Sequence, residues 1–298
     1  MIKKPNFIII GAMKSATTSL YTYLKQHPDV FMTSVKEPMF FNNYNKKTDY
    51  IIKGRKPNKV TTLKQYYNLF NAAKNEIAIG EASPAYMSDK NCPSIIKQHL
   101  PDIKIIAILR QPVKRAYSNY LHARRSGRET ISNFEEAFNE EEVRMKKNWS
   151  PLYYYKSTGL YYKQLSRYYD LIPKENIHII LFEDIIKSPE AVSKEIFRFL
   201  NIDDSFIPDC SRIMNVSGKP KGLFGWFIMQ MRYYNLIPDI EFSKYLPKVV
   251  INFLFKAAYS KPKKITHDTV KKLTSLHYKD DILKLEKLIT KDLKHWLN

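Results

Sequence analysis

A lysine and two threonines follow the first apolar run of the chain at a spacing that suits anion binding. Phe7–Ile10 is continuously apolar, Gly11 follows it, and Lys14, Thr17 and Thr18 come next. A strand that turns directly into a helix aims backbone N–H groups and the helix N-terminus at one point, where they bind phosphate-like anions. Lys14 adds a positive charge there, and the threonine hydroxyls can cap the helix or donate to anionic oxygens. The segment therefore predicts a phosphate-binding or sulfate-binding turn.

This turn does not have the spacing of a Walker A loop. That motif requires Gly-x4-Gly-Lys-Ser/Thr, whereas Lys14 lies only three residues after Gly11. A P-loop-like nucleotide kinase or nucleotidase, the second class of function, would also need an acidic residue for Mg²⁺. Because neither feature is in place, this class is less favoured.

A later strand end carries an arginine. The largely apolar run Ile103–Leu109 is followed by Arg110, and Pro112 suits the first turn of the next helix. Ser118 lies about one and a half helical turns further on. Since a guanidinium offers paired donors to an anion, Arg110 and Ser118 are candidates for a second anion site. A capped surface helix accounts for the same residues equally well.

Taken together, the two segments resemble the nucleotide-binding elements of sulfotransferases that use 3′-phosphoadenosine 5′-phosphosulfate (PAPS). The 5′-phosphosulfate loop of that family reads Lys-x-Gly-Thr-Thr after the first strand, and Lys14, Thr17 and Thr18 match it. The resemblance implies that PAPS contacts the residues of this loop: Met13, Lys14, Ser15, Ala16, Thr17 and Thr18. Ala16 departs from the family glycine, and a left-handed backbone there would cost of order 1 kcal/mol.

The same resemblance extends to the 3′-phosphate of PAPS. The pattern Arg-x-Pro-x-x-Arg-Ala-x-Ser, from Arg110 to Ser118, is similar to the element that binds this phosphate in the family. A later loop, 215–222, resembles the segment that closes over the same side of the nucleotide in carbohydrate sulfotransferases, and Lys221 and Gly222 align best. Arg110, Ser118, Lys221 and Gly222 are therefore expected to bind the donor.

The resemblance also implies a general base. The segment 36–41 resembles the acidic residue and aromatic pair of heparan-modifying carbohydrate sulfotransferases, which places Glu37 in that role. A carboxylate within hydrogen-bond reach can take the proton of the acceptor hydroxyl as that hydroxyl attacks sulfur. Lys14 would stabilise the charge that develops on the departing nucleotide. His122 is the competing base.

Two further residues are assigned to the acceptor side. Glu81 and Tyr86 lie in a segment that resembles the Glu-x-Ser/Thr-Pro-x-Tyr pattern of the family. The resemblance implies that they bind the acceptor or support its site. Ala82 stands where heparan-type enzymes often carry lysine, so this chain departs from that pattern.

Apolar runs alternate with helical patterns along the chain, and this alternation predicts the fold. Four runs read as strands covered on both faces: Phe7–Ile10, Ile77–Gly80, Ile103–Leu109 and Ile177–Phe182. Helical spacing marks seven further segments: 17–26, 62–73, 94–100, 113–125, 133–146, 159–171 and 189–200. We therefore expect an α/β protein with a P-loop-like three-layer α/β/α architecture and a central, mainly parallel sheet. Such sheets bind ligands at the carboxyl ends of their strands.

One sulfotransferase domain over residues 1–298 is predicted, because no internal repeat or Gly/Ser linker divides the chain. Residues 222–260 are apolar and aromatic, and three interpretations stay open: core helices, an acceptor-side or lid insertion, and a membrane-touching surface. The apolar spacing within 281–297 predicts a C-terminal amphipathic helix that packs back on the body.

The charge balance favours anionic partners without identifying one. The chain has 49 basic and 29 acidic residues, a formal net charge of +20. This excess attracts anions, and solvated surface lysines explain it equally well. A basic nucleic-acid-binding protein is the least favoured class, because no recognised nucleic-acid motif appears; no nucleic-acid partner is expected. The two cysteines, Cys92 and Cys210, have no metal-type spacing, so no metal is expected.

The lack of a long apolar stretch predicts the location of the protein, and the family resemblance predicts its acceptor. No stretch reaches the ~18 apolar residues of a membrane span, so the predicted location is cytoplasmic, with a peripheral membrane contact left open. The expected co-substrate is PAPS, and the expected acceptor is a hydroxyl of a glycan, a glycolipid or a similar glycosylated molecule. The sequence does not identify the acceptor or the oligomeric state.

Overall fold

The computed structural model describes residues 2–45, 60–211, 219–222, 227, 231, 259–260 and 263–298. Almost all of the segment 222–260, which was predicted to be an acceptor-side or lid insertion, lies outside the described residues. That prediction therefore stays open.

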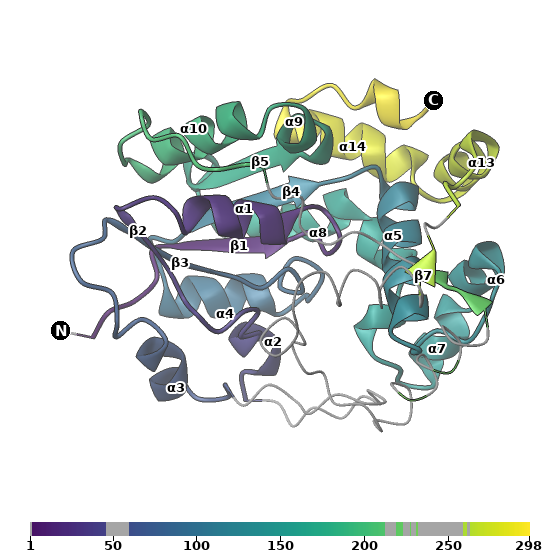
Figure 1. Cartoon of the computed structure of the whole chain (residues 1–298), viewed down its shortest axis with the longest axis horizontal. Coiled ribbons are helices and arrows are strands. Elements are labelled where there is room, and N and C mark those ends of the chain that lie inside the picture. The colour runs from purple at the N-terminus through teal and green to yellow at the C-terminus, as the bar shows by residue number, and fades with distance from the viewer. Residues whose placement is uncertain are drawn as a thin grey trace.

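A five-stranded parallel sheet forms the centre of the molecule (Figure 1). Its strands stand in the order β2-β3-β1-β4-β5, and every neighbouring pair is parallel. Their bounds are β1 (Phe7–Gly11), β2 (Val30–Met32), β3 (Ala78–Ala82), β4 (Lys104–Leu109) and β5 (Ile177–Leu181). Two short strands, β6 (Lys219–Pro220) and β7 (Tyr259–Ser260), pair antiparallel apart from this sheet.

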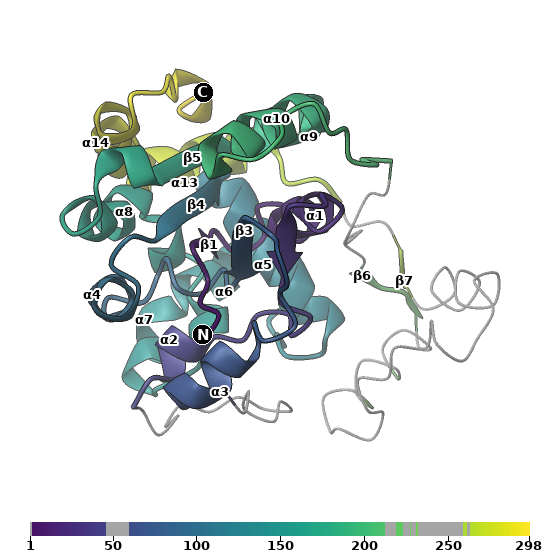
Figure 2. The ribbon, with the colours of Figure 1, turned by 90° about the vertical axis from the view of Figure 1, so that its left-hand side faces the viewer.

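Helices cover both faces of the sheet, so the predicted three-layer α/β/α architecture is confirmed (Figure 2). One face is covered by α1 (Thr17–Leu24), α9 (Phe182–Lys187) and α10 (Pro189–Leu200). The opposite face packs against α4 (Cys92–His99), α5 (Pro112–Arg125), α8 (Tyr161–Tyr169) and α14 (Lys279–Ile289). Side chains of β1 alternate between the two layers: Phe7 and Ile9 face the first, whereas Ile8 and Ile10 face the second. This alternation is the strand period of two residues.

The described residues form further helices and 3-10 turns. They are α2 (Phe40–Asn43), α3 (Leu63–Asn68), α6 (Phe134–Asn139), α7 (Glu141–Lys146) and α13 (His267–His277), with 3-10 turns at Pro151–Tyr153, Ser157–Gly159, Lys174–Asn176 and Lys294–Trp296. β2 was not predicted as a strand because three residues give too short a pattern. The pattern over 133–146 forms two helices, α6 and α7, rather than one.

The predicted C-terminal helix over 281–297 is shorter than expected. α14 ends at Ile289 because Thr290 adopts a left-handed backbone with φ 54, a conformation that stops a helix. The Glu286 carboxylate then accepts the Leu293 N–H at 2.8 Å, and Trp296 is buried in a 3-10 turn. The end of the chain therefore packs on the body as predicted, but not as one helix.

The C-terminal elements hold the residue that follows Arg110. The side-chain amide of Gln111 donates to the Thr274 hydroxyl at 2.7 Å and to the Trp296 carbonyl at 3.3 Å. Its carbonyl oxygen accepts the Lys114 N–H and so caps α5. Because Gln111 is buried, these contacts fix the strand end at which Arg110 lies.

Candidate active site

The loop between β1 and α1 contains two residues with a left-handed backbone. Lys14 has φ 69, and Ala16, which precedes the first residue of α1, has φ 65. Between them, Ser15 is fully buried, and its hydroxyl has no hydrogen-bond partner among the described residues. A buried hydroxyl without a partner costs free energy, and a phosphate oxygen bound at the start of α1 would satisfy it. The loop therefore has the donors that a phosphate group requires.

Ala16→Gly is expected to raise the free energy of unfolding by up to about 1 kcal/mol, because the left-handed backbone penalises a Cβ but not glycine. Chemical denaturation measures the change. Ala123→Gly, inside α5, is the matched control and should lower stability, because glycine is unfavourable within a helix. If Ala16→Gly also lowers stability, the left-handed conformation at residue 16 is not what limits this loop.

Arg110 joins its strand end to this loop. Its Nη1 donates to the Lys14 carbonyl at 3.1 Å, and its guanidinium carbon lies 4.3 Å from the ring centroid of Phe182. The Tyr161 hydroxyl donates to the Arg110 carbonyl at 2.8 Å. The Arg110 Nε is buried and has no hydrogen-bond partner among the residues the structure describes, and burial lowers the pKa of this guanidinium. The two predicted anion-binding elements are thus in direct contact.

Positive charge is concentrated around Lys14. Burial, together with the smaller effect of the Arg125 charge, lowers the pKa of Lys14 to about 8. The negative charge of Glu37 acts in the opposite direction, and the charges of Arg110 and Lys36 add smaller downward effects. A lysine held among other cations binds an anion strongly, because the anion relieves their mutual repulsion.

Glu37 lies close enough to Lys14 for its charge to act on the ammonium group. It belongs to the loop between β2 and α2, where both Glu37 and Met39 have left-handed backbones with φ 51. Uncommon backbone conformations in non-glycine residues often mark functional sites. The fold therefore brings Glu37, the predicted base, close to Lys14, the lysine predicted to bind the donor. The roles of both residues remain predictions.

Glu81 and Tyr86, expected on the acceptor side, are both fully buried. Glu81 accepts hydrogen bonds from the hydroxyls of Tyr66 and Ser83, and the Tyr86 hydroxyl accepts the Phe41 N–H at 3.4 Å. With no exposed surface, neither side chain is placed to touch an acceptor in this conformation. A supporting role agrees better with their positions.

The remaining donor-binding candidates lie around α5. Ser118 is half-buried on this helix, and β6, which immediately precedes Lys221 and Gly222, packs against it. Lys221 and Gly222 are exposed. Gly222 has φ +57, which explains a glycine at this turn. No described hydrogen bond joins these residues to Arg110, so their part in donor binding stays a prediction.

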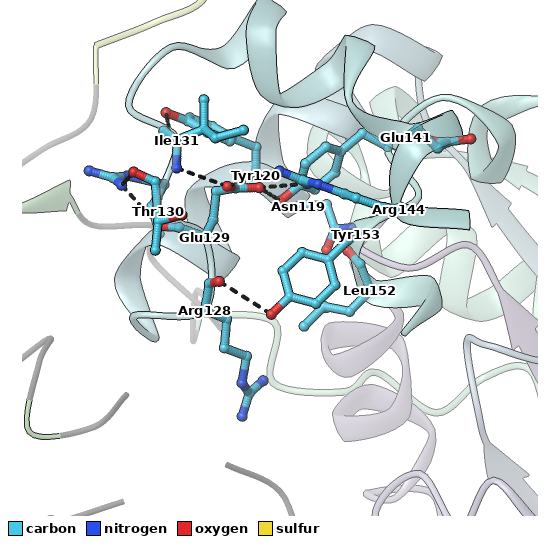
Figure 3. A network of polar contacts seen from close by, with 12 residues as sticks. Asn119, Tyr120, Arg128, Glu129, Thr130, Ile131, Glu141, Arg144, Leu152 and Tyr153 are labelled. Atoms are coloured by element: carbon cyan, nitrogen blue, oxygen red, sulfur yellow. Dashed lines mark hydrogen bonds and ion pairs between the residues drawn. The ribbon is translucent and has the colours of Figure 1, made fainter. Parts of the chain in front are cut away.

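A buried ion pair fixes the segment that follows α5 (Figure 3). Arg144 donates to both oxygens of Glu129 at 2.8 and 3.1 Å, and the Tyr155 hydroxyl donates to the same carboxylate at 2.8 Å. The Arg124 guanidinium donates to the Glu129 carbonyl at 2.9 Å. Arg128 points away from the Glu129 carboxylate. The ion pair therefore holds the end of α5, which carries Arg125.

Comparison with known proteins decides the family. The profile of the sulfotransferase domain matches residues 4–217, which include both of the segments predicted to bind anions. The chain belongs to the sulfotransferase family. The predicted resemblance is thereby confirmed.

Relatives of this sulfotransferase include membrane-associated and carbohydrate-modifying enzymes. The membrane-associated sulfotransferase kil1 of Dictyostelium discoideum is 26% identical over 276 residues, covering 67% of this chain and 56% of kil1. Carbohydrate sulfotransferase 15 of Mus musculus is 27% identical over 254 residues, covering 66% of this chain and 44% of the relative. The chain thus spans about half the length of these relatives.

A solved structure covers the whole sulfotransferase. The crystal structure of a sulfotransferase from Alicyclobacillus acidocaldarius is 30% identical, with a TM-score of 0.77, and each chain covers 100% of the other. The two proteins therefore share the fold that the described residues form.

The sequence patterns did not predict that two further residues, Arg125 and Phe182, lie near the site. Arg125 has the second-largest effect on the pKa of Lys14, after burial, and Phe182 packs against the Arg110 guanidinium. The helical spacing of Ser118, His122 and Arg125 places them on one side of α5 and could have indicated Arg125. No local signal pairs Phe182 with Arg110, because the two residues follow different strands.

Two kinds of feature are absent from the described residues of this sulfotransferase: a metal-binding cluster and a membrane-spanning helix. No group of three or more His, Cys, Asp or Glu side chains there is placed to hold a metal ion. Within the same residues, no helix combines the length and hydrophobicity required to cross a membrane.

Proposed function

We propose that this sulfotransferase moves the sulfuryl group of PAPS to an acceptor hydroxyl of a carbohydrate or glycoconjugate. One observation carries the proposal: Arg110 donates to the backbone of Lys14 at 3.1 Å, while the charge of Glu37 acts on the Lys14 side chain. Two anion-binding elements and a carboxylate therefore meet at the carboxyl ends of β1 and β4. PAPS has anionic groups at both its 5′ and 3′ positions, and such an arrangement can bind both.

The donor would lie across these strand ends. The loop from Met13 to Thr18 would hold the 5′-phosphosulfate, with the buried Ser15 hydroxyl and the N–H groups at the start of α1 as donors. Arg110 and Ser118 would hold the 3′-phosphate, and Lys221 and Gly222 would close over that side. The unpartnered Arg110 Nε supports this assignment, because a buried guanidinium nitrogen needs an acceptor.

The proposed chemistry requires one base and one stabilising cation. The acceptor oxygen forms a bond to sulfur as the bond between sulfur and the bridging phosphate oxygen breaks. Glu37 accepts the proton of the acceptor hydroxyl, and Lys14 stabilises the negative charge that remains on the phosphate. A transferring sulfuryl group carries less negative charge than a phosphoryl group, so arginine and lysine suffice and no metal is proposed.

The proposed acceptor is a glycan or glycolipid hydroxyl. Carbohydrate sulfotransferase 15 is named for carbohydrate, and this relative supports a sugar acceptor. The net charge of +20 and the membrane association named for kil1 support a peripheral contact with an anionic membrane surface. The location proposed is cytoplasmic, with such a contact, and no nucleic-acid partner is proposed.

Calorimetric titration with the desulfated donor, 3′-phosphoadenosine 5′-phosphate (PAP), tests the donor assignment. PAP is expected to bind more tightly than ATP, which has no 3′-phosphate, and more tightly than an oligonucleotide. Binding should raise the pKa of Lys14 above its value of about 8. The complex therefore takes up a proton above pH 8, and the affinity for PAP falls as pH rises through 8.

Heats measured in two buffers of different ionisation enthalpy give the number of protons taken up. Lys14→Arg is the control, because arginine stays charged and should abolish the uptake. Binding of ATP as tight as that of PAP would contradict the assignment of a 3′-phosphate site.

A further inference from the structure

A fully buried carboxylate lies directly behind the loop that carries Glu37. Glu81, on β3, has no exposed surface. The Tyr66 hydroxyl donates to its Oε1 at 3.2 Å, and the Ser83 hydroxyl donates to its Oε2 at 2.7 Å. Tyr66 and Ser83 are themselves fully buried. An ionised carboxylate in such a place is retained only with hydrogen-bond donors around it.

Ser83 connects this carboxylate to the backbone beside Glu37. The Ser83 oxygen accepts the N–H of Met39 at 3.0 Å while its own proton points to Glu81. Met39 has φ 51, as Glu37 does, so this loop contains two uncommon backbone conformations in three residues. Such conformations persist only where surrounding contacts hold them. The bond from Met39 to Ser83 is a contact of this kind, and Glu81 orients it.

The two carboxylates also act on each other through charge. Burial outweighs the opposing hydrogen bonds from Ser83, Tyr86 and Tyr66 and raises the pKa of Glu81 to about 7. The negative charge of Glu37 raises it slightly. These are the titratable groups that face Glu81 from α3, from the turn after β3 and from the Glu37 loop.

We propose that Glu81 is a positioning residue for Glu37: its carboxylate orients the Ser83 hydroxyl, which holds the Met39 N–H and thereby fixes the loop that carries the base. The inference rests on the proposed function, since Glu37 is the base only there. Protonation of Glu81 turns one of its oxygens from an acceptor into a donor, so Tyr66 or Ser83 must then reverse its hydrogen bond. A proton on Oε2 makes the Ser83 oxygen accept from Glu81 as well as from Met39, which weakens its hold on the loop, so the positioning is complete only when Oε2 is unprotonated.

The test compares three variants of the full chain. Glu81→Gln and Ser83→Ala are expected to lower kcat by roughly 10- to 100-fold, because small displacements of a catalytic group have effects of this size. Their affinity for PAP should stay unchanged, since no hydrogen bond among the described residues joins Glu81 or Ser83 to the loop from Met13 to Thr18. Tyr66→Phe is the matched control: it removes the other buried hydrogen bond to Glu81 but not the link to Met39. It should lower thermal stability and, well above pH 7, leave kcat close to that of the wild type. Its fall in kcat should move to higher pH, because the hydrogen bond from Tyr66 lowers the pKa of Glu81.

The pH dependence separates positioning from general structural support. Wild-type kcat should fall as pH drops through about 7, where Glu81 becomes protonated. Glu81→Gln should lack this change between pH 6 and 8, because glutamine does not titrate. If Glu81→Gln does not fold, Ser83→Ala carries the test.

Each of the other outcomes would contradict either the positioning role of Glu81 or the proposed function on which that role rests. Wild-type kcat in both Glu81→Gln and Ser83→Ala, with PAPS as donor, would overturn the positioning role but keep the sulfotransferase. A loss in Tyr66→Phe equal to that in Ser83→Ala would show only structural support. Activity in Glu37→Gln together with inactivity in Glu81→Gln would make Glu81 the base. No sulfuryl transfer by the wild type would instead remove the proposed function.

Discussion

Replacing Lys14 with alanine is expected to lower kcat by roughly 10²- to 10³-fold, the loss typical of removing a group that stabilises transition-state charge. The affinity for PAP should fall much less. Arg110, Ser15 and the N-terminus of α1 remain to bind the nucleotide, whereas the charge on the leaving phosphate oxygen grows only as the bond to sulfur breaks. Single-turnover rates with PAPS and calorimetric titration with PAP measure the two effects separately.

Lys36→Ala is the matched control for this experiment. Lys36 is an exposed lysine whose charge also acts on Lys14, so its removal tests whether any nearby positive charge suffices. We expect only a small change in kcat. Equal losses of turnover and of PAP affinity in Lys14→Ala would show that Lys14 holds the donor and does no more.

Glu37→Gln is expected to lower kcat by roughly 10²- to 10⁴-fold, because an amide cannot accept the proton that a general base removes. Glutamine has nearly the same shape as glutamate and meets the same backbone requirement at φ 51, so the loop should keep its conformation. PAP affinity should be little changed. Mass spectrometry of candidate glycan and glycolipid acceptors, incubated with isotopically labelled PAPS, detects the sulfated product and identifies the acceptor.

His122→Gln provides the comparison, because His122 is the rival base on α5. Its imidazole Nδ1 lies 3.5 Å from an Arg125 nitrogen, beside a cation rather than a carboxylate, and we expect turnover to persist. Full turnover in Glu37→Gln would remove that residue from its assigned role. Loss of turnover in His122→Gln alone would transfer the role to the histidine.

The sequence by itself determined four of the five strands of the central sheet and the edge at which a ligand is expected. The apolar runs at Phe7–Ile10 and Ile103–Leu109 form central strands because both of their faces are covered by helices. Parallel strands bring their carboxyl ends to one edge, so the pattern predicted Lys14 and Arg110 at the same edge of the sheet. The apolar runs and the residues that follow them are local patterns, which can be recognised in the sequence without knowledge of the fold.

Only the tertiary structure decided the features that depend on residues far apart in the chain. Glu81 became a buried residue behind the loop because α3 and the Glu37 loop enclose it, and no spacing around position 81 predicts that burial. The left-handed backbones at Glu37 and Met39 are likewise not predictable from residue types that usually avoid this conformation, whereas the family resemblance had raised it at Ala16. Arg125 acts on Lys14 because α5 folds back over the strand ends. Burial, strain and charge coupling arise from packing between segments, and therefore only the folded chain specifies them.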